Sequence, residues 1–124
     1  MNKAIKIFIA DNEPDMTRLT LFRLKKLGFE VEVAENGLQA VEKIRKSKPD
    51  LIILDEDIPL FDGYKVCSQV RANDLLKAIP VVMLVLSEDG IETKMEKMGS
   101  NGFLVKPYSF DKLKEKIDLF TKKS

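Results

Sequence analysis

The sequence contains no histidine and only one cysteine, Cys67. Without histidine, the chain cannot itself form a Ser-His-Asp triad, carry a phosphohistidine or bind a metal through imidazole. A single cysteine excludes an internal disulfide, and its place beside Val66 and Val70 in a helical pattern favours burial as a small apolar residue. Any metal site in this chain would therefore be built from oxygen ligands.

Long apolar runs and a surplus of one charge are also absent. No run approaches the roughly 20 residues of a membrane span, and the N-terminal stretch MNKAIKIFIADNEPD lacks the shape of a signal peptide. The balance of 21 Lys and Arg against 20 Asp and Glu gives a net charge of +1, which argues against a nucleic-acid surface or a basic membrane patch. We therefore expect a cytoplasmic protein with no direct nucleic-acid or membrane binding, folded as one domain over residues 1–124.

Short apolar runs alternate with amphipathic segments along the chain. Pro14 suits the first turn of a helix that Gly28 ends, while Asn36 and Ser109 are placed to cap two later helices. The first two helices are expected to bury the apolar positions Leu19, Phe22, Leu24 and Leu27, and Leu38, Val41 and Ile44. The expected strands are 4–10, 30–34, 50–54, 79–86 and 102–105, and the expected helices are about 14–28, 37–47, 63–72, 89–98 and 110–123.

The order of these segments is strand then helix, repeated five times. Such alternation predicts a parallel sheet with right-handed crossovers and helices on both faces. Five units suit a flavodoxin-like, doubly wound α/β fold with five helices and a five-stranded sheet in the order 2-1-3-4-5.

Polar residues follow the strands where a ligand is expected. In open α/β sheets, ligands bind outside the carboxyl ends of the strands. The residues after the first, third and fifth strands are Asp11-Asn12, Asp55-Glu56-Asp57 and Lys106. Converging oxygens suit a hard cation such as Mg²⁺, and a lysine facing the same point can balance an added anion. Neither G-x-x-x-x-G-K-[ST] nor G-x-G-x-x-G occurs, so a nucleotide site is not expected.

Four stretches together resemble a known family. They are DNEPD after the first strand, PDLIILDEDIPLFDG around the third, IPVVML in the fourth and GFLVKPYSFDKL near the end. With these motifs the chain resembles a response-regulator receiver domain of two-component signalling, over nearly its whole length. The D-x-x-x-P-x-x-D-G pattern from Asp55 to Gly63, combined with Lys106-Pro107, is the most specific part of the resemblance.

The resemblance implies a role for each matching residue. Asp55 matches the phosphoacceptor, which takes a phosphoryl group from the phosphohistidine of a sensor histidine kinase or phosphotransfer protein. Lys106 matches the lysine that pairs with the acceptor and the phosphoryl group, and its bond to Pro107 matches one that is usually cis. Phe103 matches the aromatic switch position. The implied Mg²⁺ ligands are Asp11, Asp55, the backbone carbonyl of Asp57 and, at the second acidic position, Asn12.

The sequence departs from the family pattern at several positions of this site. Asn12 stands where a second acid is usual, so we expect weak Mg²⁺ binding. Val85 stands where a threonine or serine usually binds the phosphoryl group, and it has no hydroxyl to do so. Leu86 replaces a usually small residue and, with Ser87, borders the access to Asp55. Phe103 has no hydroxyl to exchange between buried and exposed states.

Three functional hypotheses remain open. The first is a phosphorylated receiver with weakened metal binding and switching. The second is a pseudo-receiver that acts as an interaction module without phosphorylation. The third is a true enzyme such as a metal-dependent phosphatase, although nothing in the sequence suggests a substrate site beyond the phosphoryl site. In the receiver reading, a downstream protein or output domain binds the face of the fourth helix, fifth strand and fifth helix, around Met95, Phe103 and Tyr108, and the chain is a monomer or weak dimer.

Overall fold

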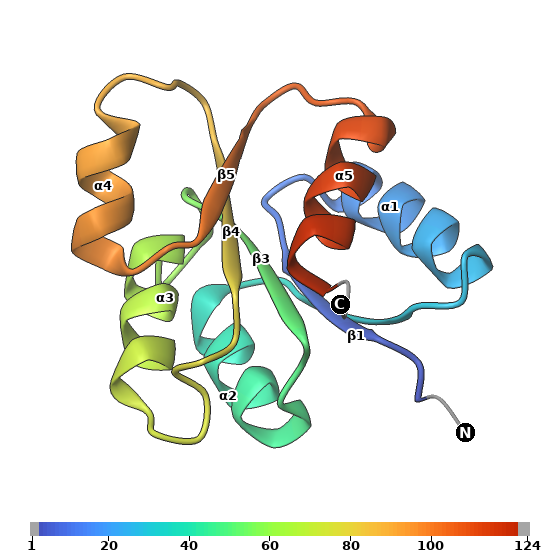
Figure 1. Ribbon diagram of the computed structural model, residues 1–124, viewed down its shortest axis with the longest axis horizontal. Helices are drawn as coiled ribbons and strands as arrows, with labels where there is room; N and C mark the ends of the chain where they lie inside the picture. The colour runs from blue at the N-terminus through green and yellow to red at the C-terminus, as the bar shows by residue number, and fades with distance from the viewer. Residues whose placement is uncertain (1–2, 122–124) are drawn as a thin grey trace.

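The computed structural model describes residues 3–121, and in it strands and helices alternate from end to end (Figure 1). Residues 122 and 123 of the expected last helix lie outside the described residues. The strands are β1 (Lys6–Ala10), β2 (Glu30–Ala34), β3 (Leu51–Asp55), β4 (Val81–Val85) and β5 (Gly102–Val105). The helices are α1 (Pro14–Lys26), α2 (Gly37–Ser47), α3 (Gly63–Ala72), α4 (Ile91–Met98) and α5 (Phe110–Thr121).

All strand pairs are parallel, and the sheet order is β2-β1-β3-β4-β5. Helices α1 and α5 cover one face of the sheet, and α2, α3 and α4 cover the other (Figure 1). The predicted flavodoxin-like fold and strand order are therefore confirmed. Strands β3 and β4 are buried along their whole length because helices lie on both of their faces.

The expected helix caps are also present. The side chain of Asn36 accepts a hydrogen bond from the backbone N–H of Gln39 at 2.8 Å, and the Ser109 hydroxyl accepts one from Lys112 N at 3.2 Å. Strands β1 and β4 are shorter than predicted, and α4 begins at Ile91 rather than residue 89. None of the helices within residues 3–121 is long and apolar enough to cross a membrane.

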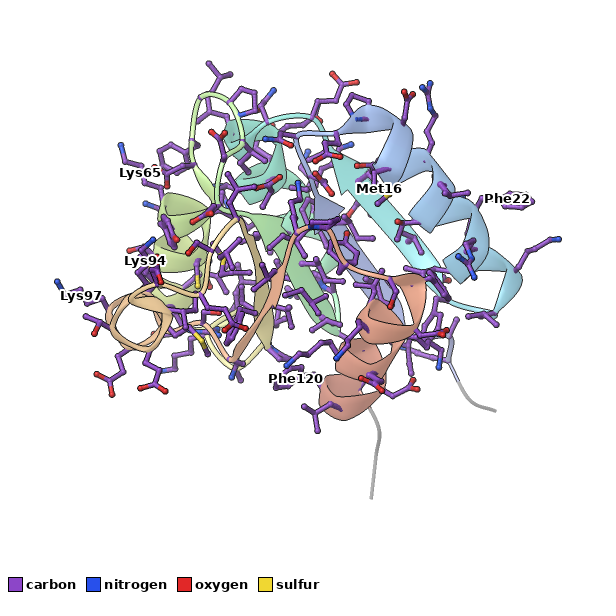
Figure 2. All side chains as sticks on the ribbon, turned by 90° about the horizontal axis from the view of Figure 1, so that it is seen from above. Met16, Phe22, Lys65, Lys94, Lys97 and Phe120 are labelled. Atoms are coloured by element: carbon purple, nitrogen blue, oxygen red, sulfur yellow. The ribbon has the colours of Figure 1, made fainter. Side chains whose placement is uncertain are left out.

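The buried face of α1 differs from the prediction. Leu24 is buried, but Leu19, Phe22 and Leu27 are 55%, 58% and 55% exposed, and Phe22 projects away from the fold (Figure 2). The positions that face the sheet are instead Thr17, Thr20 and Leu24, which share one side of the helix at i, i+3 and i+7. Burial of Thr17 is tolerated because its hydroxyl donates to the Glu13 carbonyl at 3.1 Å.

The buried face of α2 was also predicted only in part. Ile44 is buried and Val41 is half-buried, but Leu38 is 53% exposed. Ala40 faces the sheet in its place, and small residues let a helix lie close to its neighbours. The first turn of α2 is tight as well, because a Cβ on Gly37 would lie 1.7 Å from the carbonyl oxygen of Phe61. The loop that follows Asp55 is thereby packed against α2.

Candidate functional site

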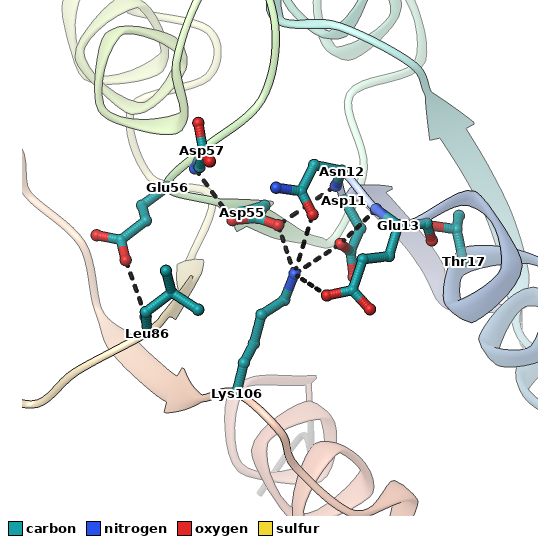
Figure 3. Close-up of polar contacts among 9 residues, drawn as sticks. All are labelled: Asp11, Asn12, Glu13, Thr17, Asp55, Glu56, Asp57, Leu86 and Lys106. Atoms are coloured by element: carbon teal, nitrogen blue, oxygen red, sulfur yellow. Dashed lines mark hydrogen bonds and ion pairs between the residues drawn. The ribbon is translucent and has the colours of Figure 1, made fainter.

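Three strand ends bring an acidic pair and a lysine together at one edge of the sheet (Figure 3). Asp11 follows β1, Asp55 is the last residue of β3, and Lys106 follows β5. The Lys106 Nζ lies 2.6 Å from Asp55 Oδ2 and 2.9 Å from Asp11 Oδ1. This convergence follows from the strand order, because parallel strands all end at the same edge.

The group is buried and charged. The side chains of Asp11, Asp55 and Lys106 are 2%, 4% and 9% exposed. Burial alone would lower the pKa of Lys106, but hydrogen bonds and charge from Asp11 and Asp55 outweigh it and hold that pKa above its ordinary value. Lys106 is therefore an ammonium at neutral pH, and it offsets the repulsion between the two carboxylates.

Backbone N–H groups fix the direction of both carboxylates. Asp55 Oδ1 accepts from Asp57 N at 3.0 Å and Asp55 Oδ2 from Asn12 N at 3.3 Å. Asp11 Oδ1 accepts from Glu13 N at 3.0 Å. Because these donors belong to the turns after β1 and β3, the loops themselves orient the Asp55 oxygens toward the mouth of the site.

Glu13 is a member of this group that the sequence reasoning missed. Its Oε1 lies 3.2 Å from Lys106 Nζ. Asn12 Oδ1 lies 3.4 Å from the same nitrogen. The side chain is 57% exposed, so it lies at the rim rather than in the buried centre. Its position next to Asp11-Asn12 was the available signal, since a run of polar residues after a strand often turns several side chains toward one point.

Glu56 lies to the side of the buried group (Figure 3). Its Oε1 accepts from the Tyr64 hydroxyl at 2.6 Å, and its Oε2 accepts from the backbone N–H of Leu86 at 2.8 Å. Both contacts reach residues distant in sequence, and neither was foreseen.

The oxygen donors fit a hard cation in kind. Asp11 and Asp55 supply carboxylates and Asn12 supplies an amide oxygen, the ligand types that Mg²⁺ prefers. In this structure those oxygens surround the Lys106 ammonium, and within residues 3–121 no set of three or more Asp, Glu, Cys or His is grouped as a metal site. The donor set therefore suits Mg²⁺ chemically, with Asn12 as its neutral member and the Glu13 carboxylate at its rim.

The remaining predicted positions surround the site as follows. Val85 ends β4 and is 1% exposed, whereas Leu86 is 70% exposed. The Ser87 hydroxyl accepts from Asp89 N at 3.1 Å, within the loop that follows β4. Phe103 on β5 is half-buried, with Lys116 Nζ 5.8 Å from its ring centroid. The peptide bond between Lys106 and Pro107 is cis, as expected.

Residues 7–118 match the response regulator receiver domain family. This chain is a receiver domain. It is 34% identical to chemotaxis protein CheY-3 of Vibrio cholerae, covering 95% of this chain and 92% of that protein. It is 30% identical to the transcriptional regulatory protein PhoP of Bacillus subtilis, of which it spans only 50%. The crystal structure of chemotaxis protein CheY4 of Vibrio cholerae superposes with a TM-score of 0.89 at 26% identity, covering 95% of this chain and 99% of that one.

Membership places the chain in two-component signalling. Receiver domains are signalling domains rather than classical enzymes. They interact with histidine kinases or phosphotransfer proteins and with output domains, and they generally bind Mg²⁺ at the active site. The chain spans about half the length of PhoP, a transcriptional regulator, and nearly all of CheY-3.

Proposed function

We propose that this receiver domain accepts a phosphoryl group on Asp55 and thereby changes its binding to a partner. In the transfer, one Asp55 oxygen attacks the phosphorus of a phosphohistidine on a sensor kinase or phosphotransfer protein. The P–O bond forms as the P–N bond breaks, and the electron pair of that bond returns to the imidazole nitrogen. The observation that carries the proposal is the 2.6 Å contact of Lys106 Nζ with the buried Asp55 carboxylate at the sheet edge.

The residues around Asp55 have different proposed roles. Lys106 supplies positive charge to the carboxylate and to the incoming phosphoryl oxygens. The N–H groups of Asn12 and Asp57 hold the carboxylate in its direction. Asp11, Asp55, the Asp57 carbonyl and Asn12 would hold Mg²⁺, which when bound supplies charge that offsets the repulsion between carboxylates and phosphate. With Asn12 neutral, we propose that this binding is weak.

Incubation with acetyl phosphate and Mg²⁺ tests the proposal directly. The wild type should gain one phosphoryl group by intact mass spectrometry, and Asp55→Asn should gain none. Asp89→Asn, which changes an exposed acid in the loop after β4, is the matched control and should behave as the wild type. Failure of the folded wild type to take up phosphate, with a variety of donors, would contradict the proposal.

A pseudo-receiver is the second candidate, and two features favour it. Val85 offers no hydroxyl to a phosphoryl group, and the Lys106 ammonium already contacts both buried carboxylates. In that case the fold serves as an interaction module, and the same acetyl phosphate experiment separates the two candidates.

The proposed partner surface is the α4–β5–α5 face around Met95, Phe103 and Tyr108, all of which are half-buried. We further propose that residues 1–124 act as one cytoplasmic domain and that this domain is a monomer or weak dimer. Phe103 is its proposed aromatic switch. Amide shift changes on adding a downstream partner should map to α4, β5 and α5. Changes confined to α2 and α3 would contradict this choice of surface.

A further inference from the structure

The loop after β4, residues 86–90, is attached to the strand that carries Asp55 by a single carboxylate. Glu56 Oε2 accepts from Leu86 N at 2.8 Å, and Glu56 Oε1 accepts from the Tyr64 hydroxyl of α3 at 2.6 Å. We call these contacts the Glu56 bridge. Because each oxygen accepts one of these hydrogen bonds, a rotation of the carboxylate away from Leu86 would also break the hydrogen bond from Tyr64.

The hydroxyl of Tyr64 is held firmly in this bridge. Burial, and next the hydrogen bond with the Glu56 carboxylate, raise the pKa of Tyr64 well above its ordinary value. A phenol that stays protonated remains a donor, so the bridge persists across the neutral range. Glu56 itself is half-buried, where a hydrogen bond to a carboxylate is stronger than at an open surface.

The other hydrogen bonds of the loop are local. In the described part of the chain, Asp89 N donates to the Ser87 hydroxyl, and Ile91 N donates to the Glu88 carbonyl. Both stay within the loop and the start of α4. Residues 86–90 are all exposed, and Val85 before them has no hydroxyl that could respond to a phosphoryl group. Among the hydrogen bonds of residues 3–121, the Glu56 bridge is thus the one that links this loop to the strand carrying Asp55.

We propose that Glu56 is a positioning residue that holds the loop in place in the unphosphorylated protein and opposes its rearrangement when Asp55 is modified. This inference rests on the proposed function, because it assigns a resting restraint to the same site. A ligand or modification shifts a conformational equilibrium only by its difference in interaction between two states. A bridge present in the resting state alone therefore reduces the response to phosphorylation.

The first experiment uses no phosphoryl donor. Solvent exchange of the Leu86 amide is measured by NMR in the wild type, Glu56→Ala, Glu56→Gln and Tyr64→Phe, with Glu88→Gln as the control acid in the same loop. Loss of a charge-assisted hydrogen bond should speed Leu86 exchange by about tenfold in Glu56→Ala. Glu56→Gln and Tyr64→Phe should lie between Glu56→Ala and the wild type, while Glu88→Gln should match the wild type. Equal Leu86 exchange in all five proteins would overturn the inference.

The second experiment adds beryllofluoride, a phosphoryl mimic, with Mg²⁺. Glu56→Ala should bind the mimic more tightly than the wild type by severalfold, and amides of residues 86–90 should shift further. Equal affinity and equal shifts would overturn the proposed opposition to phosphorylation. Should no variant bind the mimic while Leu86 exchange still responds to Glu56→Ala, the phosphoacceptor function fails and the resting restraint stands.

Discussion

At the scale of single residues, position 12 sets how much negative charge faces a cation at the mouth of the sheet. The Asn12 amide oxygen lies 3.4 Å from Lys106 Nζ, beside the buried carboxylates of Asp11 and Asp55. Asn12→Asp adds a carboxylate to those of Asp11, Asp55 and the rim residue Glu13. Because Mg²⁺ is a hard cation whose affinity rises with ligand charge, Asn12→Asp should tighten Mg²⁺ binding by about tenfold or more. Isothermal titration calorimetry measures the change.

A control separates local from general charge effects. Gln69→Glu places the same added charge on the exposed surface of α3 and should leave Mg²⁺ affinity unchanged. Micromolar Mg²⁺ binding by the wild type, or an equal gain from both variants, would mean that Asn12 is not what limits the site.

Val85 is the second residue that sets the response. It ends β4 and is buried, so a threonine there would place a hydroxyl near the phosphoacceptor end of the sheet. A charge-assisted hydrogen bond to an anion contributes about 1.5–3 kcal/mol. With beryllofluoride and Mg²⁺, Val85→Thr should therefore increase amide shifts over residues 85–106, and more so when combined with Asn12→Asp.

The comparison variant is Val105→Thr, which makes the same change at the partner position of Val85 on β5. It should not increase the response. Full-sized amide shifts in the wild type, with no gain from Val85→Thr, would show that the signal is transmitted by another route.

At the scale of elements, one arginine joins the C-terminal part of α3 to the segments around it. Arg71 Nε donates to the Gly99 carbonyl at 2.7 Å, where α4 ends. Arg71 also donates to the Lys77 and Ile79 carbonyls at 3.0 and 2.8 Å, and to Asn101 Oδ1 at 2.7 Å. The planar guanidinium makes this set possible, because its donors point in several fixed directions.

Arg71→Ala should lower the free energy of unfolding by about 2–4 kcal/mol, since several carbonyls would lose a charged donor at once. Arg71→Lys should recover little of this, because an ammonium cannot reach all four acceptors. Urea denaturation gives the free energies, with Gln69→Ala on the exposed side of α3 as the reference. A cost for Arg71→Ala no larger than that for Gln69→Ala would refute the idea that Arg71 joins these elements.

At the scale of the whole molecule, the two tyrosines predict how stability depends on alkaline pH. Burial, and next the charge of Asp11, raise the pKa of Tyr108 to about 12. The pKa of Tyr64 is raised further, by burial and its contact with Glu56. An unfolded chain ionises its tyrosines near pH 10. Above that pH the folded state binds more protons than the unfolded state, so stability should fall as pH rises from about 10 through 12.

Two measurements check this prediction. The ultraviolet absorbance of tyrosinate should show little ionisation of the folded protein at pH 10, and Tyr64→Phe and Tyr108→Phe assign the two titrations. Urea denaturation at a series of pH values should show the decline in stability. Lys106 affects stability in the same direction, because its pKa is also raised in the folded state. The folded state therefore keeps this proton at pH values where the unfolded chain has begun to lose it. Constant stability across this range, or ordinary tyrosine titration in the folded state, would contradict the prediction.

The order of the strands and helices, and the residues at the strand ends, could be predicted from local patterns in the chain. Apolar runs such as Leu51–Leu54 and the caps at Asn36 and Ser109 are local signals, and chain connectivity then limits how parallel strands can be arranged. From that arrangement, the meeting of Asp11, Asp55 and Lys106 at one edge could be predicted without coordinates.

Which side chains of different elements face one another depends instead on how the folded chain packs. Helical spacing favoured Leu19 and Phe22 for burial, but the sheet contacts Thr17 and Thr20, because packing selects one side of a helix that spacing alone leaves open. The contacts of Glu56 with Tyr64 and Leu86 also depend on packing rather than on local sequence. Its direction depends on donors 8 and 30 residues away in sequence, and only the folded chain brings those donors within hydrogen-bonding distance.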